Sequence, residues 1–115
     1  IASAAAPSGN WAFTVDAADP ESGVTRIDWY GQFNGECFPA DDPTAPGERV
    51  AHDFTGQPFA SVSLGGEAQV TVSREAPLCP AGLMFGPPGL GVDAWAVITN
   101  GAGLTVETEH DLVFT

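Results

Sequence analysis

The sequence contains no lysine, and its three arginines stand against fifteen acidic residues, which gives a formal net charge of −12. A surface of this sign repels the phosphates of nucleic acids and of anionic membranes, so neither is expected as a partner. The absence of lysine also excludes an isopeptide cross-link from lysine to asparagine or aspartate. No apolar run reaches the roughly 18 residues that a membrane-spanning helix needs, so no membrane span is expected.

Catalytic signatures are missing as well. No G-x-S-x-G motif occurs, and nothing in the sequence selects a pair of carboxylates for acid–base chemistry. The two histidines, His52 and His110, could build a zinc or acid–base site together with carboxylates. Both fall on apolar-facing positions of predicted strands, which favours the alternative of partly buried histidines with structural hydrogen bonds. We therefore predict that the chain is not an enzyme.

Cysteine is scarce, with Cys37 and Cys79 as the only two. Their separation fits no metal-binding spacing such as C-x-x-C, so the pair predicts one disulfide bond. The alternative is two unpaired, buried thiols. The small residues of Ile1–Ala6 are typical of the region around a signal-peptide cleavage site, which predicts export. Export and a disulfide together predict an extracellular or cell-surface location.

No helical period of any length occurs, and apolar residues instead alternate with polar ones in short runs. Alternation of this kind is the period of a β-strand with one buried face. The predicted strands are Trp11–Val15, Val24–Phe33, Val50–Phe54, Phe59–Leu64, Glu67–Ser73 and Val92–Thr99. The last of these is apolar on both faces, which predicts a central strand of a sheet.

Glycine and proline lie between the predicted strands, where they act as turn residues. The predicted turns are Asp19–Gly23, Asn34–Gly35, Gly65–Gly66 and Asn100–Gly101. The turn at Gly65–Gly66 predicts a hairpin between the strands on either side of it. Pro39–Glu48 is the longest polar stretch and predicts an exposed loop, whereas Leu78–Leu90 is rich in proline and glycine and predicts an irregular segment.

The last residues show the clearest alternation of the chain. From Gly103 onward, most even positions are apolar, and the acids Glu107, Glu109 and Asp111 lie at odd positions. This pattern predicts a single strand that runs to Thr115, with its even-numbered face buried in the core.

The segment Val15–Tyr30, VDAADPESGVTRIDWY, resembles a stretch of bacterial and archaeal immunoglobulin-like surface modules. In those modules a strand ends in an acidic turn, and the next strand carries an aromatic pair before an Asn-Gly or Asp-Gly turn, which here would be Asn34–Gly35. The resemblance implies a sandwich used for display, adhesion or assembly. We predict an all-β, antiparallel immunoglobulin-like β-sandwich of about seven or eight strands over residues 10–115, preceded by an extended segment, residues 1–9.

The acidic turn is a second candidate for a metal site. Asp16, Asp19 and Glu21 could together offer oxygen ligands to Ca²⁺, although no strict calcium-binding spacing is present. The alternative is a solvated acidic turn in a chain that is acidic everywhere. No cofactor is expected.

Two segments are candidates for contacts with other molecules. The N-terminal segment, through Ile1, Ala2, Ala4 and Ala6, could pair with the sheet edge of a neighbouring chain or form an edge strand of its own sheet. The proline-rich segment could expose Met84, Phe85, Pro87 and Pro88 as a contact surface. Its alternative is a cap over one end of the sandwich, with Met84 and Phe85 in the core.

We predict an extracellular structural protein, a subunit of a surface filament or coat that assembles noncovalently with copies of itself. In this prediction, residues 1–9 of one subunit complete a sheet of the next by β-strand addition. The alternative is a secreted or surface binding module, an adhesin or inhibitor, that holds a protein or a glycan through its proline-rich loops.

Overall fold

The computed structural model describes residues 2–5, 9–42 and 44–114, and all regular secondary structure in them is β-strand. The strands are β1 (Ala2–Ala5), β2 (Trp11–Ala18), β3 (Val24–Pro39), β4 (Glu48–Phe54), β5 (Ala60–Glu67), β6 (Gln69–Glu75), β7 (Leu83–Asn100), β8 (Thr105–Glu107) and β9 (Asp111–Phe114). All pairings between them are antiparallel, which confirms the prediction of an all-β antiparallel fold.

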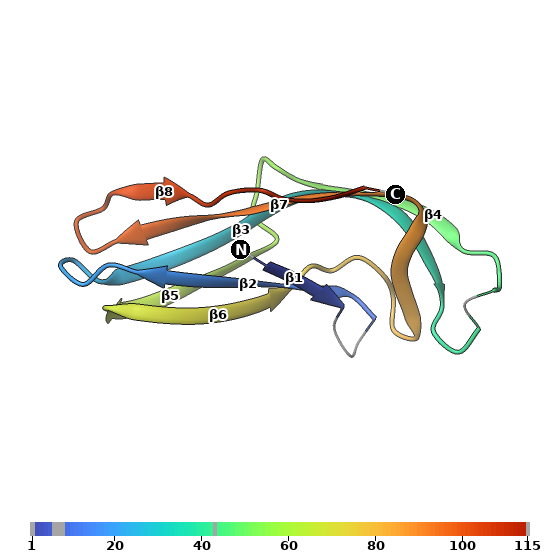
Figure 1. The fold of residues 1–115 in the computed structure, drawn as a ribbon, viewed down its shortest axis with the longest axis horizontal. Helices are drawn as coiled ribbons and strands as arrows, with labels where there is room; N and C mark the ends of the chain where they lie inside the picture. The colour runs from blue at the N-terminus through green and yellow to red at the C-terminus, as the bar shows by residue number, and fades with distance from the viewer. Residues whose placement is uncertain (1, 6–8, 43, 115) are drawn as a thin grey trace.

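The strands form two sheets, one of three strands in the order β1-β2-β6 and one of six strands. In the six-stranded sheet, the long strands β3 and β7 pair with each other at the centre. Strands β5 and β4 follow one another along the far side of β3, and β8 and β9 do the same along the far side of β7. The molecule is elongated, 51 × 23 × 19 Å, and Figure 1 shows β7 and β8 along one long side with β6 along the other.

The core lies between the two sheets and is built from alternating residues of the strands. Phe13 and Val15 of β2 are fully buried, as are Trp29 and Phe33 of β3. The indole N–H of Trp29 donates to the backbone carbonyl of Phe13 at 3.1 Å, so a hydrogen bond also joins the two sheets. The alternation in the sequence therefore identifies the inward-facing residues of both strands correctly.

Cys37 and Cys79 form a disulfide bond, as predicted. The bond joins the end of β3 to the connection between β6 and β7. Near it, the pairing of β3 with β7 shifts register between Asn34 and Glu36. At this end of the molecule, the last part of β3 and the first part of β7 bend together, which Figure 1 shows at the right.

The predicted turn at Asn34–Gly35 is wrong, because β3 continues through both residues to Pro39. Asn34 is paired with Ala51 of β4 on one side and with Gly91 of β7 on the other. A Cβ atom at Gly35 would lie only 2.9 Å from the ring of Phe85, so the glycine is needed here for close packing. Pairing on both sides thus outweighs the turn tendency of Asn-Gly.

The predicted hairpin at Gly65–Gly66 is also wrong. Both glycines lie within β5, and the chain turns after them, at Ala68. Strand β5 pairs with β3 and β6 pairs with β2, so the connection passes from one sheet to the other. The half-buried side chains of Leu64 and Val70, on either side of the turn, both pack against the common core. Two consecutive strands that each have one apolar face need not pair with each other. They can also lie in different sheets and bury their apolar faces in the core between the sheets.

The segment Leu78–Leu90 is less irregular than predicted, because β7 begins at Leu83 and runs to Asn100. The prediction of a central strand over Val92–Thr99 is confirmed, since this part of β7 lies between β3 and the two short strands β8 and β9. The exposed loop and the turns at Asp19–Gly23 and Asn100–Gly101 are also found where expected.

The predicted single C-terminal strand is wrong in two respects. The segment forms two short strands, β8 and β9, and its large apolar side chains Leu104, Val106, Leu112 and Phe114 are 56–69% exposed. Thr108 interrupts the ladder, since its hydroxyl oxygen accepts from the N–H of Ala96 and its N–H donates to the carbonyl of Ala96.

The interruption changes the register by one residue. Val106 pairs with Ile98 of β7, whereas Leu112 pairs with Asp93. Because neighbouring residues of a strand point to opposite faces, a slip of one residue moves the even-numbered side chains from one face to the other. Val106 therefore lies on the inner face of the six-stranded sheet, and Leu112 lies on the outer face.

Candidate functional site

The strand β2 is only partly covered along one side. Strand β1 pairs with its first half, from Ala5 opposite Trp11 to Ala2 opposite Thr14. On its other side, β6 pairs with β2 as far as Ala18. Among the described residues, the second half of β2, residues 15–18, therefore has a neighbouring strand on one side only, and its other edge is open.

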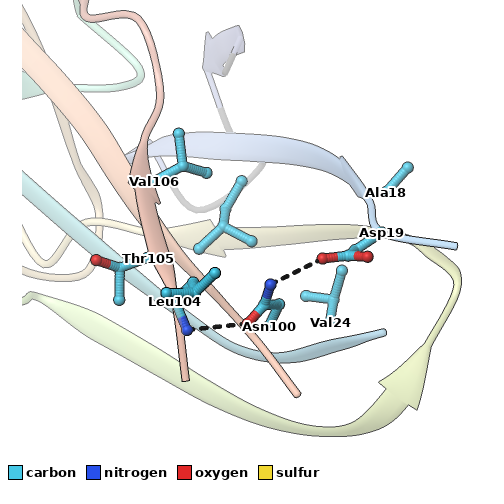
Figure 2. A pocket seen from close by; sticks show the side chains of 8 residues that line it. Ala18, Asp19, Val24, Asn100, Leu104, Thr105 and Val106 are labelled. Atoms are coloured by element: carbon cyan, nitrogen blue, oxygen red, sulfur yellow. Dashed lines mark hydrogen bonds between the residues drawn. The ribbon is translucent and has the colours of Figure 1, made fainter. Parts of the chain in front are cut away.

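A pocket of about 240 Å³ lies at this open edge, between the two sheets. We call it the edge pocket, and its lining residues are Ala18, Asp19, Val24, Ile98, Asn100, Leu104, Thr105 and Val106. Figure 2 shows the side chains of Val106 and Leu104 on one side of it and those of Ala18 and Val24 on the other. The edge pocket thus offers apolar side chains beside an unpaired strand edge.

Two polar side chains at the edge pocket are held in place by hydrogen bonds. The side-chain amide of Asn100 donates through Nδ2 to the carboxylate of Asp19 at 3.0 Å, and its Oδ1 accepts from the backbone N–H of Leu104 at 2.9 Å (Figure 2). Asp19 also accepts from the backbone N–H groups of Ser22 and Glu21. These bonds, with that from Ser22 contributing most and that from Asn100 next, hold the pKa of Asp19 below its ordinary value.

The three residues that were predicted to bind calcium have other surroundings in the structure. Asp19 uses its carboxylate to close the turn between β2 and β3, Asp16 accepts a hydrogen bond from Thr71, and Glu21 is exposed. In the part of the chain that the structure describes, no three histidine, cysteine or acidic side chains are grouped as a metal site would require.

A column of three stacked rings stands on the outer face of the six-stranded sheet. Tyr30 of β3 stacks on Trp95 of β7, with ring centroids 6.0 Å apart. His110, from the connection between β8 and β9, stacks on the other side of Trp95 at 4.4 Å. Its Nδ1 lies 2.6 Å from Asp93, and its Nε2 lies 3.3 Å from Glu107.

The surroundings of His110 act on its pKa in opposite directions. Partial burial alone would lower the pKa, but the hydrogen bonds to Asp93 and Glu107 and the charges of these two carboxylates raise it above its ordinary value. His110 is therefore part of an ion-paired cluster in its protonated form. His52 differs, because its Nε2 donates to the backbone carbonyl of Leu78 at 2.9 Å and its ring stacks on Phe54.

The proline-rich segment divides between core and surface. Phe85 is only 3% exposed and packs edge-on against Trp11, with ring centroids 5.9 Å apart. Met84 is half-buried, whereas Pro87 and Pro88 are exposed. The guanidinium of Arg49 donates to the carbonyl of Pro88, which ties this segment to β4.

The N-terminal residues that are predicted to contact a neighbouring chain fall into two groups. Ala2 and Ala4 belong to β1 and pair with β2 of their own chain. Ile1 and Ala6 lie outside the described residues. The sequence pattern did not predict the edge pocket, because Leu104 and Val106 were expected in the core and no feature of the sequence marks the end of β1 against β2.

Comparison with known proteins finds no family model, no curated protein and no solved structure that matches this chain. Among the described residues, no helix is long and apolar enough to cross a membrane.

Proposed function

We propose that this chain is an extracellular structural subunit with an immunoglobulin-like β-sandwich, and that it assembles noncovalently by β-strand addition. The observation that carries the proposal is the open edge of β2 over residues 15–18, which lies beside the edge pocket. An unpaired edge supplies main-chain hydrogen-bonding groups to an incoming strand, and an adjacent apolar pocket can accept its side chains.

The incoming strand is the N-terminal segment, residues 1–9, of a second copy. The first fifteen residues of the chain carry no charged side chain, so this segment can approach an acidic neighbour without repulsion between carboxylates. The segment can pair with residues 15–18 of β2, in line with β1. It can also replace β1 itself, because an exchange between identical chains preserves the four residue pairs that β1 makes.

Two further features support a structural role outside the cell. The disulfide Cys37–Cys79 suits an oxidising environment. His52 and His110, the candidates for acid–base catalysis, are bound to structural partners, and the proposal assigns the chain no enzymatic activity.

The experiment compares particle size across a range of protein concentrations, by light scattering on a sizing column and negative-stain imaging of the same fractions. We expect the wild-type chain to form filaments or large regular particles. We expect the chain without residues 1–9 to elute as a folded monomer, slightly below the 11.8 kDa of the full chain. Circular dichroism in the aromatic region establishes that the shortened chain keeps its fold.

A matched pair of full-length variants tests the acceptor side. Val106→Glu places a carboxylate at the edge pocket and should abolish assembly. Leu112→Glu makes the same kind of change at a comparably exposed apolar residue, 56% against 60%, on the opposite face, and should assemble like the wild type. Continued assembly without residues 1–9 would contradict the proposal. A wild-type chain that stays monomeric at every concentration would also contradict it and would favour the alternative of a binding module.

A further inference from the structure

A second hollow lies on the outer face of the six-stranded sheet, away from the edge pocket. We call it the outer depression, a space of about 170 Å³ lined by Gln32, Asn34, Gly91, Val92, Asp93 and Phe114. It spans three strands, because Gln32 of β3 pairs with Asp93 of β7, and Phe114 of β9 pairs with Gly91. Strand pairing therefore brings two amides, one carboxylate and one aromatic ring to the same place.

The floor of the outer depression is bare backbone at Gly91. A Cβ atom at this position would lie 3.8 Å from ring carbons of Phe114 and 3.9 Å from Cβ of Asn34. Any larger side chain would therefore occupy the space between the amide and the ring. The glycine keeps the hollow open.

The two side-chain amides of the outer depression are not used to hold the fold together. Among the described residues, no hydrogen bond reaches the side-chain amides of Gln32 and Asn34. Asp93 uses Oδ1 to accept from His110, which fixes the orientation of its carboxylate. The ring of Phe114 is 69% exposed, so it is accessible to a ligand. The hollow thus combines free donors and acceptors with an exposed apolar ring.

We propose that the outer depression binds a pyranose unit of a neutral glycan. A pyranose ring has an apolar C–H face that packs against an aromatic ring. Its hydroxyl groups both donate and accept, so they pair with amide and carboxylate groups such as those of Gln32, Asn34 and Asp93. The net charge of −12 disfavours acidic polysaccharides, so we expect the ligand to be uncharged and not anionic.

This inference is independent of the strand-addition proposal. The outer depression and the edge pocket share no residue, and they lie on opposite faces of the six-stranded sheet. A subunit could therefore bind a glycan through its outer face whether or not its β2 edge is occupied.

The experiment is affinity electrophoresis of the whole chain in native gels that contain a soluble polysaccharide. The neutral probes are hydroxyethyl cellulose, laminarin, xyloglucan and galactomannan, and alginate is the anionic probe. We expect at least one neutral probe to slow the chain and alginate to leave its migration unchanged. Variant Phe114→Ala should weaken the apparent affinity for that probe by about tenfold or more, which is the loss of one good contact.

Leu112→Ala is the matched control, because Leu112 lies on the same outer face and is comparably exposed, 56% against 69% for Phe114, but lines neither the outer depression nor the edge pocket. It should migrate like the wild type in every gel. A second variant, Gln32→Ala, removes an exposed amide without touching the apolar surface and should also weaken binding. The proposal is overturned if no neutral probe slows the chain, if alginate slows it equally, or if Phe114→Ala and Gln32→Ala bind as well as the wild type.

Discussion

His110 lies flat against Trp95, with ring centroids 4.4 Å apart and ring planes only 6° from parallel. Trp95 belongs to the central strand β7, whereas His110 belongs to the connection between β8 and β9. The contact therefore holds the C-terminal segment against the sheet at the position where its register changes. Asp93 and Glu107 bind the two nitrogen atoms of the same ring, so the strength of this attachment depends on protonation.

The stability of the chain should consequently depend on pH through His110. The pKa of His110 is raised in the folded state, so its contribution is fully present below the unfolded value of about 6.5 and is lost as the pH rises through the folded value. We expect His110→Gln to narrow the stability difference between pH values below and above this range. Urea unfolding of the wild type and of His110→Gln at several pH values measures this difference. An identical pH dependence of stability in the two proteins would exclude a contribution from the protonation of His110.

The disulfide should contribute strongly to stability, because it closes a loop over a sequence separation of 42 residues. In the chain-entropy model, a loop of this size corresponds to about 4 kcal/mol in the free energy of unfolding. We expect the double variant Cys37→Ser, Cys79→Ser to lose an amount of this order in urea unfolding. The reduced wild-type chain should unfold like the double variant, and a chain that is equally stable in both redox states would show that the loop is constrained in other ways.

The loss of stability on removing an aromatic side chain should depend on whether that side chain is buried. Phe33 is fully buried and contacts the rings of Phe13, Phe54 and Phe59 at centroid distances of 5.6–6.1 Å. Phe33→Ala should lower the free energy of unfolding by roughly 3–5 kcal/mol, because it leaves a cavity in the core. Phe114→Ala removes an equal side chain from an exposed position and should change it by less than about 0.5 kcal/mol. Similar losses in the two variants would contradict the described burial.

Alanine variants of two glycines with positive φ should distinguish the cost of backbone strain from the cost of steric overlap. Gly66 has a φ of +91° and open space around it, so Gly66→Ala should cost only the left-handed conformation, about 1–2 kcal/mol. Gly23 has a φ of +74°, and a Cβ atom there would overlap the carbonyl group of Gly66. Gly23→Ala should therefore lower the melting temperature clearly more than Gly66→Ala does. Equal shifts would mean that the end of β5 around Gly66 moves aside freely.

Local patterns in the sequence predict much of this fold. The alternation around Phe13 and Trp29 identifies the core, because each of these strands has one face against the opposite sheet. The run Val92–Thr99, which is apolar on both faces, predicts its central position, and the cysteine pair predicts the disulfide. The inferences on the core and the central strand depend only on residues that are close in sequence, and two cysteines allow only one pairing.

The errors share a different cause, which is long-range pairing. Whether Gly65–Gly66 closes a hairpin or crosses between sheets depends on whether β5 finds β3 and β6 finds β2. The face that Leu112 presents depends on a one-residue slip at Thr108, which the alternation alone cannot reveal. Both candidate sites follow from such pairings, since the edge pocket needs Leu104 opposite β2 and the outer depression needs Phe114 beside Gly91.

The disulfide also sets how far the chain can be stretched. The Cα atoms of Cys37 and Cys79 are 5.7 Å apart, whereas the 42-residue separation corresponds to roughly 140–150 Å of extended polypeptide. Mechanical tension applied outside the bridge therefore cannot draw out β4, β5 and β6, however completely the sheets are pulled apart. Reduction would add that contour length to the chain, so the redox state of one bond would determine the maximum extension of the chain under load.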